Sequence, residues 1–279
     1  MKTFLLDASL CNGCYCCQIA CKDEHVGNDW TPYAKPQPDT GQFWIKVNET
    51  VRGTVPKVRV SYLPQLCHHC DEAACLKVCK PGAIYRRADG MVIIDPEKCT
   101  GCQLCPDACP YDSIYFNEDL NLAQKCTGCA HLLDDGWDVP RCVDACPTGA
   151  LRFGEEEDSE CKDEIARADP MPKHGHGRVA FLNLPKKFVA GTVYDPIEKE
   201  VVIGATCTLQ EKASAQTYQV QTDDFGDFWF EGLPDGGDYS LRIEKDGQSK
   251  VIDPIDGTTD VNLGDIPMRL AARATAAAQ

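Results

Sequence analysis

The stretch that decides the fold is Cys99-Thr100-Gly101-Cys102-Gln103-Leu104-Cys105-Pro106-Asp107-Ala108-Cys109-Pro110. Its spacing, C-x2-C-x2-C-x3-C-P, is typical of Cys ligands to [4Fe–4S] clusters. In such a run the first three thiolates ligate one cluster, whereas the fourth ligates a second cluster. One run of this form therefore predicts that further Cys ligands lie elsewhere in the chain.

Three further groups of four Cys complete the pattern. The group that begins at Cys11 has the same spacing, and the group that begins at Cys67 has a longer middle gap. The last group joins one C-x2-C pair to a C-x3-C-P element. A C-x3-C turn followed by Pro and an apolar segment recurs, which indicates an internal repeat. Sixteen of the 19 Cys thus predict four clusters: Cys11, Cys14, Cys17, Cys21, Cys67, Cys70, Cys75, Cys79, Cys99, Cys102, Cys105, Cys109, Cys126, Cys129, Cys142 and Cys146.

Three Cys lie outside this scheme. Cys16 is interpreted as a spare loop thiol, Cys161 as an incidental thiol, and Cys207 as part of a strand's buried face. Zinc bound by two C-x2-C pairs is the alternative metal, but it leaves the third Cys of each C-x2-C-x2-C run unused. His68 and His69 lie between ligands and are expected to form hydrogen bonds near sulfur rather than to bind metal.

Composition and charge restrict the function. Acidic residues number 43 and basic residues 28, which gives a net charge of −15 and disfavours nucleic acid as a partner. The apolar run at the N-terminus is too short for a signal peptide. No stretch reaches the about 18–20 apolar residues of a membrane span. We therefore expect a soluble, cytoplasmic protein without direct membrane insertion, and export together with a partner subunit stays open.

The chain of 279 residues is long enough for two domains. We expect an α+β fold with tandem ferredoxin-like modules over 1–154, in which the second module, about 62–120, is inserted in the first. An acidic run followed by Pro and Gly predicts a linker over 155–186. Short alternating segments predict a β-sandwich or barrel over 187–270. The Ala-rich residues 271–279 are expected to be a frayed tail.

The layout of the four groups resembles the iron–sulfur subunits of molybdopterin oxidoreductases, such as dimethyl-sulfoxide, polysulfide and nitrate reductases and formate dehydrogenases. The spacing alone leaves nearest-neighbour and nested pairings of the groups open. The resemblance implies the nested pairing. Its four ligand sets are Cys11, Cys14, Cys17 and Cys146; Cys21, Cys126, Cys129 and Cys142; Cys67, Cys70, Cys75 and Cys109; and Cys79, Cys99, Cys102 and Cys105.

A closer resemblance covers nearly the whole chain. Residues 89–98 and 123–135, and the element Gly226-Asp227-Phe228-Trp229-Phe230, are similar to small subunits of pyrogallol–phloroglucinol transhydroxylases. This resemblance implies a transthyretin-like or Cna-B-like C-terminal domain. The transhydroxylase pattern lacks most of the third Cys group, whereas this chain keeps the complete set that includes Cys79. That set implies a terminal cluster through which electrons enter or leave.

The resemblance implies an electron-transfer subunit that is not catalytic by itself. It would carry electrons between a large molybdenum bis-pterin subunit, which alone holds that cofactor, and an external electron carrier. The partner's expected substrate is a polyhydroxylated aromatic, to be hydroxylated, dehydroxylated or transhydroxylated. Three alternatives stay open: a subunit of a respiratory-type reductase, a free-standing polyferredoxin, and an adhesion module with structural clusters.

The sequence offers no catalytic residues of its own. It contains no glycine-rich dinucleotide motif and no acid–base pair on a recognisable scaffold. Lys125 and Arg141 each lie beside a Cys ligand. They are expected either to raise the potential of a cluster or to be ordinary solvated basic residues.

Overall fold

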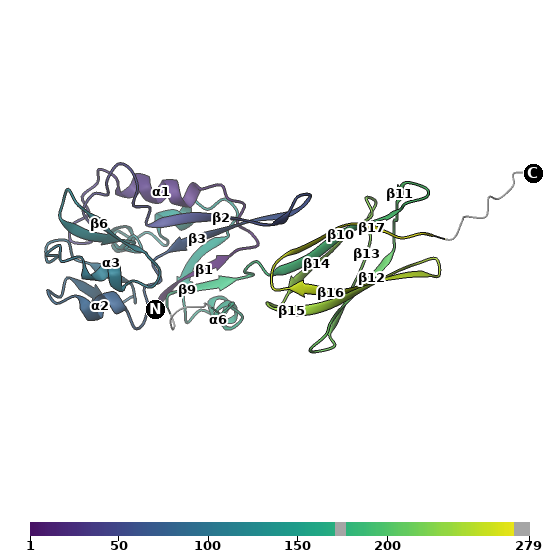
Figure 1. Cartoon of the computed structure of the whole chain (residues 1–279). Coiled ribbons are helices and arrows are strands. Elements are labelled where there is room, and N and C mark those ends of the chain that lie inside the picture. Colours follow the sequence, from purple (N-terminus) through teal and green to yellow (C-terminus); the bar gives the residue numbers. More distant parts are fainter. Residues whose placement is uncertain (171–176, 271–279) are drawn as a thin grey trace, which may run out of the picture. The chain divides into compact units, whose positions relative to one another are not determined.

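The computed structural model describes residues 1–170 and 177–270. The chain forms two compact units (Figure 1). Unit 1 contains Met1–Thr50 and Ser61–Leu184, and unit 2 contains Val51–Val60 together with the chain from Pro185 onward. The tail that the sequence predicts over 271–279 lies outside the described residues.

Unit 1 contains a three-stranded sheet in the order β8 (Leu151–Glu155), β1 (Lys2–Asp7) and β9 (Val179–Leu182). β1 runs antiparallel to β8 and parallel to β9. Its apolar residues are buried on both faces, since Phe4 and Leu6 belong to the main core cluster and Leu5 packs against Cys161. A continuous apolar run is the expected pattern for a strand covered on both sides.

The remaining strands of unit 1 form three hairpins, and five short helices lie before, between and after them in the chain. Helices α1 and α5 pack side by side, as do α2 and α3, which are labelled in Figure 1. The hairpins are β2 (Ile45–Thr54) with β3 (Lys57–Leu66), β4 (Ile84–Arg86) with β5 (Val92–Ile94), and β6 (Ile114–Asn117) with β7 (Leu122–Lys125). The helices are α1 (Cys16–His25), α2 (Ala74–Val78), α3 (Leu104–Ala108), α4 (Ala130–Asp134) and α5 (Arg141–Asp144).

The prediction of a linker over 155–186 is corrected in part, because half of the described residues in this segment lie in a helix or a strand. It contains helix α6 (Ser159–Ala166) and strand β9. The acidic residues around Asp158 precede and begin α6, where negative charge favours a helix N-terminus. Cys161 on this helix is buried against Leu5 and Ala180 rather than exposed on a flexible segment.

Unit 2 is all-β, as the sequence predicts, and consists of two sheets. In the first sheet β10 pairs with β11, β14 and β17; in the second the order is β13, β12, β15 and β16. The core is apolar and includes Cys207, Leu209 and Phe230, so the prediction that Cys207 is a core residue is confirmed. The strands are β10 (Lys187–Asp195), β11 (Glu200–Val201), β12 (Thr206–Glu211), β13 (Thr217–Gln221), β14 (Asp227–Leu233), β15 (Gly237–Lys245), β16 (Gln248–Gly257) and β17 (Val261–Pro267).

The tip of the β2–β3 hairpin, Val51–Val60, belongs to unit 2. Within that unit the Arg52 guanidinium pairs with Asp260 at 3.1 Å, and Lys57 pairs with Asp227. The Arg59 guanidinium lies 3.7 Å from the centre of the Trp229 ring. Unit 2 therefore includes a segment that lies more than a hundred residues before its other strands in the sequence.

Candidate metal centres

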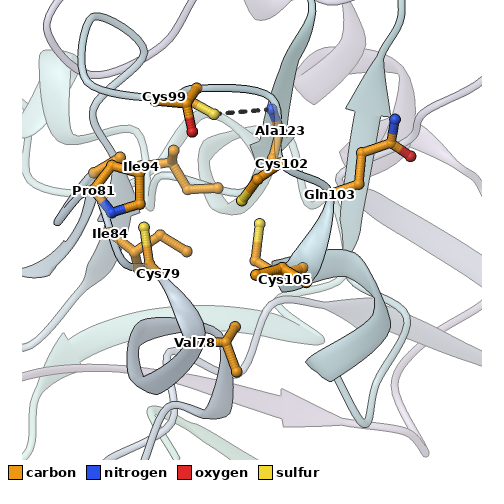
Figure 2. Close-up of a pocket in the computed structure, with 13 residues that line it drawn as sticks. Val78, Cys79, Pro81, Ile84, Ile94, Cys99, Cys102, Gln103, Cys105 and Ala123 are labelled. Atoms are coloured by element: carbon orange, nitrogen blue, oxygen red, sulfur yellow. Dashed lines mark hydrogen bonds between the residues drawn. The ribbon is translucent and has the colours of Figure 1, made fainter.

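One pocket in unit 1, of about 340 Å³, brings together four of the predicted Cys ligands. Figure 2 shows the sulfurs of Cys79, Cys99, Cys102 and Cys105 pointing toward one shared space. Cys79 caps the end of α2, and Cys105 lies on α3. The rest of the wall is mostly apolar and includes Ile94. The four thiols therefore come from two helices and the loop before the second of them.

A second pocket, of about 350 Å³, gathers Cys67, Cys70, Cys75 and Cys109. Cys75 lies on α2 and Cys109 caps the end of α3, so these two helices contribute Cys to both pockets. Among the residues that the structure describes, no three Cys, His, Asp or Glu side chains are gathered as the ligands of a single metal ion. In both pockets the sulfurs instead surround a common space.

The remaining eight predicted ligands fall into two further neighbourhoods. Burial, together with the nearby sulfurs of Cys11, Cys146 and Cys14, raises the pKa of Cys17 to about 12. Burial likewise raises the pKa of Cys142, and here the contributing neighbours include Cys129, Cys21 and Cys126. Negative charge on the neighbouring sulfurs disfavours ionisation of each thiol, and the positive charge of bound iron would relieve this repulsion.

Backbone amides point at several of these sulfurs. Each of the two pockets and each of the two further neighbourhoods contains such a sulfur, at nitrogen–sulfur distances of 3.4–3.5 Å. Amide donors aimed at thiolate sulfur are the interactions that stabilise and tune iron–sulfur clusters. The donor set therefore fits [4Fe–4S] clusters. The pairs are His69 to Cys67, Ser113 to Cys109, Ala123 to Cys99, Gly128 to Cys126, and Leu151 to Cys146.

A glycine before the second Cys shapes three of the ligand loops. Gly13, Gly101 and Gly128 have φ values of +70°, +69° and +63°. A Cβ at Gly101 would lie 2.6 Å from the backbone oxygen of Asn121, and one at Gly13 would lie 2.5 Å from the ring of Tyr62. Glycine is the residue that adopts this backbone conformation and allows so close an approach. The C-x-G-C pattern is thus a requirement of the loop geometry.

The exposure of the Cys differs from one neighbourhood to another. Cys21, Cys126, Cys129 and Cys142 are all buried. In contrast, Cys14 is exposed in the neighbourhood of Cys17, and Cys102 is exposed in the pocket of Figure 2. Two neighbourhoods therefore reach the surface of unit 1 through at least one ligand.

The two His residues between ligands lie close to the second pocket. His68 stacks on Tyr111 with ring centres 3.7 Å apart, and burial lowers the pKa of His68 to about 4. The His69 ring is buried and hydrogen-bonds the backbone of Val92, while the His69 amide donates to Cys67. His69 thus forms a hydrogen bond to sulfur, as the sequence predicts, but through its backbone.

A buried His that the sequence analysis did not identify lies near another ligand. His25 on α1 has its Nε2 4.0 Å from the Cys129 sulfur, and its ring packs against Trp44. Burial lowers the pKa of His25 to about 3, so the ring is neutral. The signal available in the sequence is its spacing, because His25 lies four residues after Cys21 and so on the same face of the helix.

The two basic residues that the sequence singled out have different environments. The Arg141 guanidinium pairs with the carboxylates of Asp144 and Glu24. The Lys125 ammonium is buried and lies 3.4 Å from the Cys67 sulfur. The Lys125 ammonium therefore contacts a predicted ligand directly, whereas the Arg141 guanidinium is paired with two carboxylates.

Comparisons with known proteins agree with this site. The model of a 4Fe–4S dicluster domain matches residues 58–156, and the model of a carboxypeptidase regulatory-like domain matches residues 189–267. The pyrogallol hydroxytransferase small subunit of Pelobacter acidigallici is 34% identical over 95% of this chain and 98% of its own length. The B subunit of the anaerobic dimethyl sulfoxide reductase of Escherichia coli is 35% identical over 61% of this chain and 82% of its own length.

A solved structure also resembles part of the chain. The major pilin subunit BcpA of Bacillus cereus matches 34% of this chain and 32% of its own with 18% identity and a TM-score of 0.24. Within the described residues, no helix combines the length and the apolar character needed to cross a membrane.

The Cys neighbourhoods, their amide donors and the dicluster match define an iron–sulfur protein that transfers electrons. More specifically, the chain belongs to the family of iron–sulfur subunits of molybdopterin oxidoreductases of the dimethyl sulfoxide reductase type, together with the pyrogallol hydroxytransferase small subunit.

Proposed function

We propose that this chain holds four [4Fe–4S] clusters in tandem ferredoxin-like modules and carries electrons between a large molybdenum bis-pterin subunit and an external carrier. When bound, the clusters supply one-electron redox chemistry. The proposed ligand sets are Cys11, Cys14, Cys17 and Cys146 (set I); Cys21, Cys126, Cys129 and Cys142 (set II); Cys67, Cys70, Cys75 and Cys109 (set III); and Cys79, Cys99, Cys102 and Cys105 (set IV).

The observation that carries this proposal is the identity of the four Cys residues that line each of the two pockets. The Cys that line one pocket are those of set III, and the Cys that line the other are those of set IV (Figure 2). Both sets combine residues from two different Cys groups of the sequence. The electrostatic neighbours of Cys17 and of Cys142 support sets I and II in the same way.

The connections between the sets support a linear order. Helix α1 carries Cys17 of set I and Cys21 of set II, and α2 with its C-cap carries Cys75 of set III and Cys79 of set IV. Sets I and II, and likewise sets III and IV, are therefore linked across one helical turn, and Lys125 lies between sets II and III. The exposed ligands Cys14 and Cys102 belong to sets I and IV, which are the two ends of this order. We assign set I to exchange with the molybdenum subunit and set IV to exchange with the external carrier.

The partner and its substrate follow from the extent of the similarity. The match to the pyrogallol hydroxytransferase small subunit covers 95% of the chain, including the all-β part, whereas the match to the dimethyl sulfoxide reductase subunit covers 61%. We therefore propose a partner that acts on a polyhydroxylated aromatic, in a cytoplasmic heterodimer. A complete set IV provides an outlet for electrons, which favours a net oxidation or reduction over a redox-neutral transfer of a hydroxyl group.

Purification under anaerobic conditions tests this function. We expect the chain to copurify with a large molybdenum-containing subunit and to contain about sixteen iron atoms, since each cubane holds four. Iron and sulfide analysis and electron paramagnetic resonance (EPR) spectroscopy measure the cluster content. A chain that purifies fully loaded without a molybdenum partner would support a free-standing polyferredoxin instead. About twelve iron atoms would contradict the four-cluster proposal.

A further inference from the structure

The junction between sets II and III differs from the other junctions. Sets I and II share helix α1, and sets III and IV share helices α2 and α3. Among the described residues, no helix carries Cys of both set II and set III. The residue that lies between these two sets is Lys125, at the end of β7. Lys125 directly precedes Cys126 of set II and contacts Cys67 of set III.

The Lys125 side chain is almost completely buried, with 2% of the residue exposed. Its Nζ atom donates to three acceptors: the Cys67 sulfur at 3.4 Å, the backbone oxygen of Cys126 at 3.0 Å, and the backbone oxygen of Val92. An ammonium group has three N–H donors and no acceptor. The site therefore accommodates a charged Lys125 with every proton directed at a partner.

No carboxylate within the described residues forms an ion pair with Lys125. A buried charge without a counter-ion is costly. The charge that balances Lys125 is thus the negative charge of the thiolates themselves.

We propose that Lys125 raises the reduction potential of the cluster held by set III, and so makes the junction between the two modules a site that accepts electrons readily. This inference rests on the proposed ligand sets. Reduction adds one negative charge to a cluster, and a fixed positive charge in a poorly solvated site stabilises that added charge. A hydrogen bond to a ligand sulfur acts in the same direction.

Lys98 provides a matched control within the same chain. Like Lys125, Lys98 directly precedes the first Cys of a C-x2-C pair. Its side chain is 63% exposed, and it pairs with the Asp95 carboxylate at 2.8 Å. Solvent and the carboxylate both screen its charge. The two Lys therefore share a sequence position and differ in burial and in what the ammonium contacts.

The test compares Lys125→Met, Lys125→Arg and Lys98→Met in the purified complex by redox titration followed with EPR. We expect Lys125→Met to lower the ratio of reduced to oxidised set III cluster at least tenfold at a fixed potential, which is a downward shift of about 59 mV for one electron. Lys125→Arg, which keeps the charge, should shift the potential less than Lys125→Met. Lys98→Met should change the ratio less than threefold.

The inference is overturned if Lys125→Met keeps its iron content and no midpoint potential moves, or if Lys98→Met causes an equal shift. Iron analysis of the wild-type complex reports separately on the cluster count, so a failure of the proposed function is distinguishable. If neither Lys125 variant loads with iron, the wild-type complex decides: after labelling of the lysine Nζ atoms with 15N, electron–nuclear double resonance should detect a 15N coupling to the set III cluster, and its absence would refute the contact.

Discussion

The two units of the molecule build their cores in different ways. In unit 1 the core clusters include predicted cluster ligands, among them Cys17, Cys67 and Cys105, and the helices that carry ligands have four to ten residues. In unit 2 the core consists of apolar side chains on paired strands, and its one Cys is Cys207. The difference indicates that unit 1 depends on a cofactor for its structure, whereas unit 2 is stabilised by hydrophobic burial.

The largest effect is expected from the removal of iron. Anaerobic chelation should abolish the protection of backbone amides from hydrogen exchange around the four Cys groups, because helices of four or five residues are not stable in isolation. Strands β12 and β15 of unit 2 should keep their protection. Hydrogen–deuterium exchange measured by mass spectrometry compares the two units in one sample. Equal losses of amide protection in both units, or no loss in unit 1, would contradict the proposal that only unit 1 depends on a cofactor for its structure.

The exposed ligand of set IV provides the next test. Replacing Cys102 by Ser should slow electron exchange with the natural carrier at least about tenfold, because it alters the cluster proposed as the outlet. Assembly with the large subunit should be unaffected. Cys16, which is also exposed but lies outside the four sets, is the matched control, and Cys16→Ser should leave the rate unchanged. Stopped-flow reduction of the carrier measures both variants. Equal rates in the two variants would refute the role of set IV.

A third test acts on unit 2 alone. Phe230 is buried in the β-sandwich core, and Phe230→Ala should destabilise this unit by about 3–5 kcal/mol through lost burial and the cavity that remains. Phe225 is 75% exposed in a turn, so Phe225→Ala is the control and should be nearly neutral. Thermal unfolding followed by circular dichroism measures stability, and EPR should report unchanged clusters. A loss of cluster signal in Phe230→Ala would show that unit 1 needs an intact unit 2.

The Cys spacing predicts the ligand groups because covalent distance along a short loop limits which thiols can share a cluster. The alternation of apolar residues likewise predicts the strands of unit 2, as at Cys207 and Leu209. The prediction of a linker was wrong because a four-residue apolar run such as Val179–Leu182 has no periodicity of its own. Its pairing with β1, which lies far away in the sequence, decides its structure.

Tertiary contacts explain the other features of the structure that the sequence does not predict. Lys98 and Lys125 have the same place in their motifs, and only the packing of β7 against its surroundings determines that Lys125 is buried. In the sequence, the tip of the β2–β3 hairpin looks like an ordinary turn. In the structure, its Arg and Lys side chains contact residues more than 150 positions later in the chain. No local pattern in the sequence carries that information.

The smallest effect concerns this hairpin tip, which is the part of unit 2 that precedes the Cys67 group in the chain. The Arg59 guanidinium lies over the Trp229 ring at 3.7 Å and pairs with the Glu231 carboxylate at 2.7 Å. Both contacts are partly exposed, and each type is worth about 0.5–1 kcal/mol at such sites.

Arg59→Ala should therefore lower the stability of unit 2 by about 1 kcal/mol. Arg59→Lys keeps the charge but loses the planar group that stacks on Trp229, so it should retain part of this stability. A double-mutant cycle with Trp229→Leu, measured by chemical unfolding, isolates the stacking contribution. A coupling energy near zero would mean that the tip is held in unit 2 by Arg52 and Lys57, whose carboxylate partners Asp260 and Asp227 are less exposed than Glu231. A clear coupling would identify Arg59 as a residue that joins the hairpin tip to the β-sandwich.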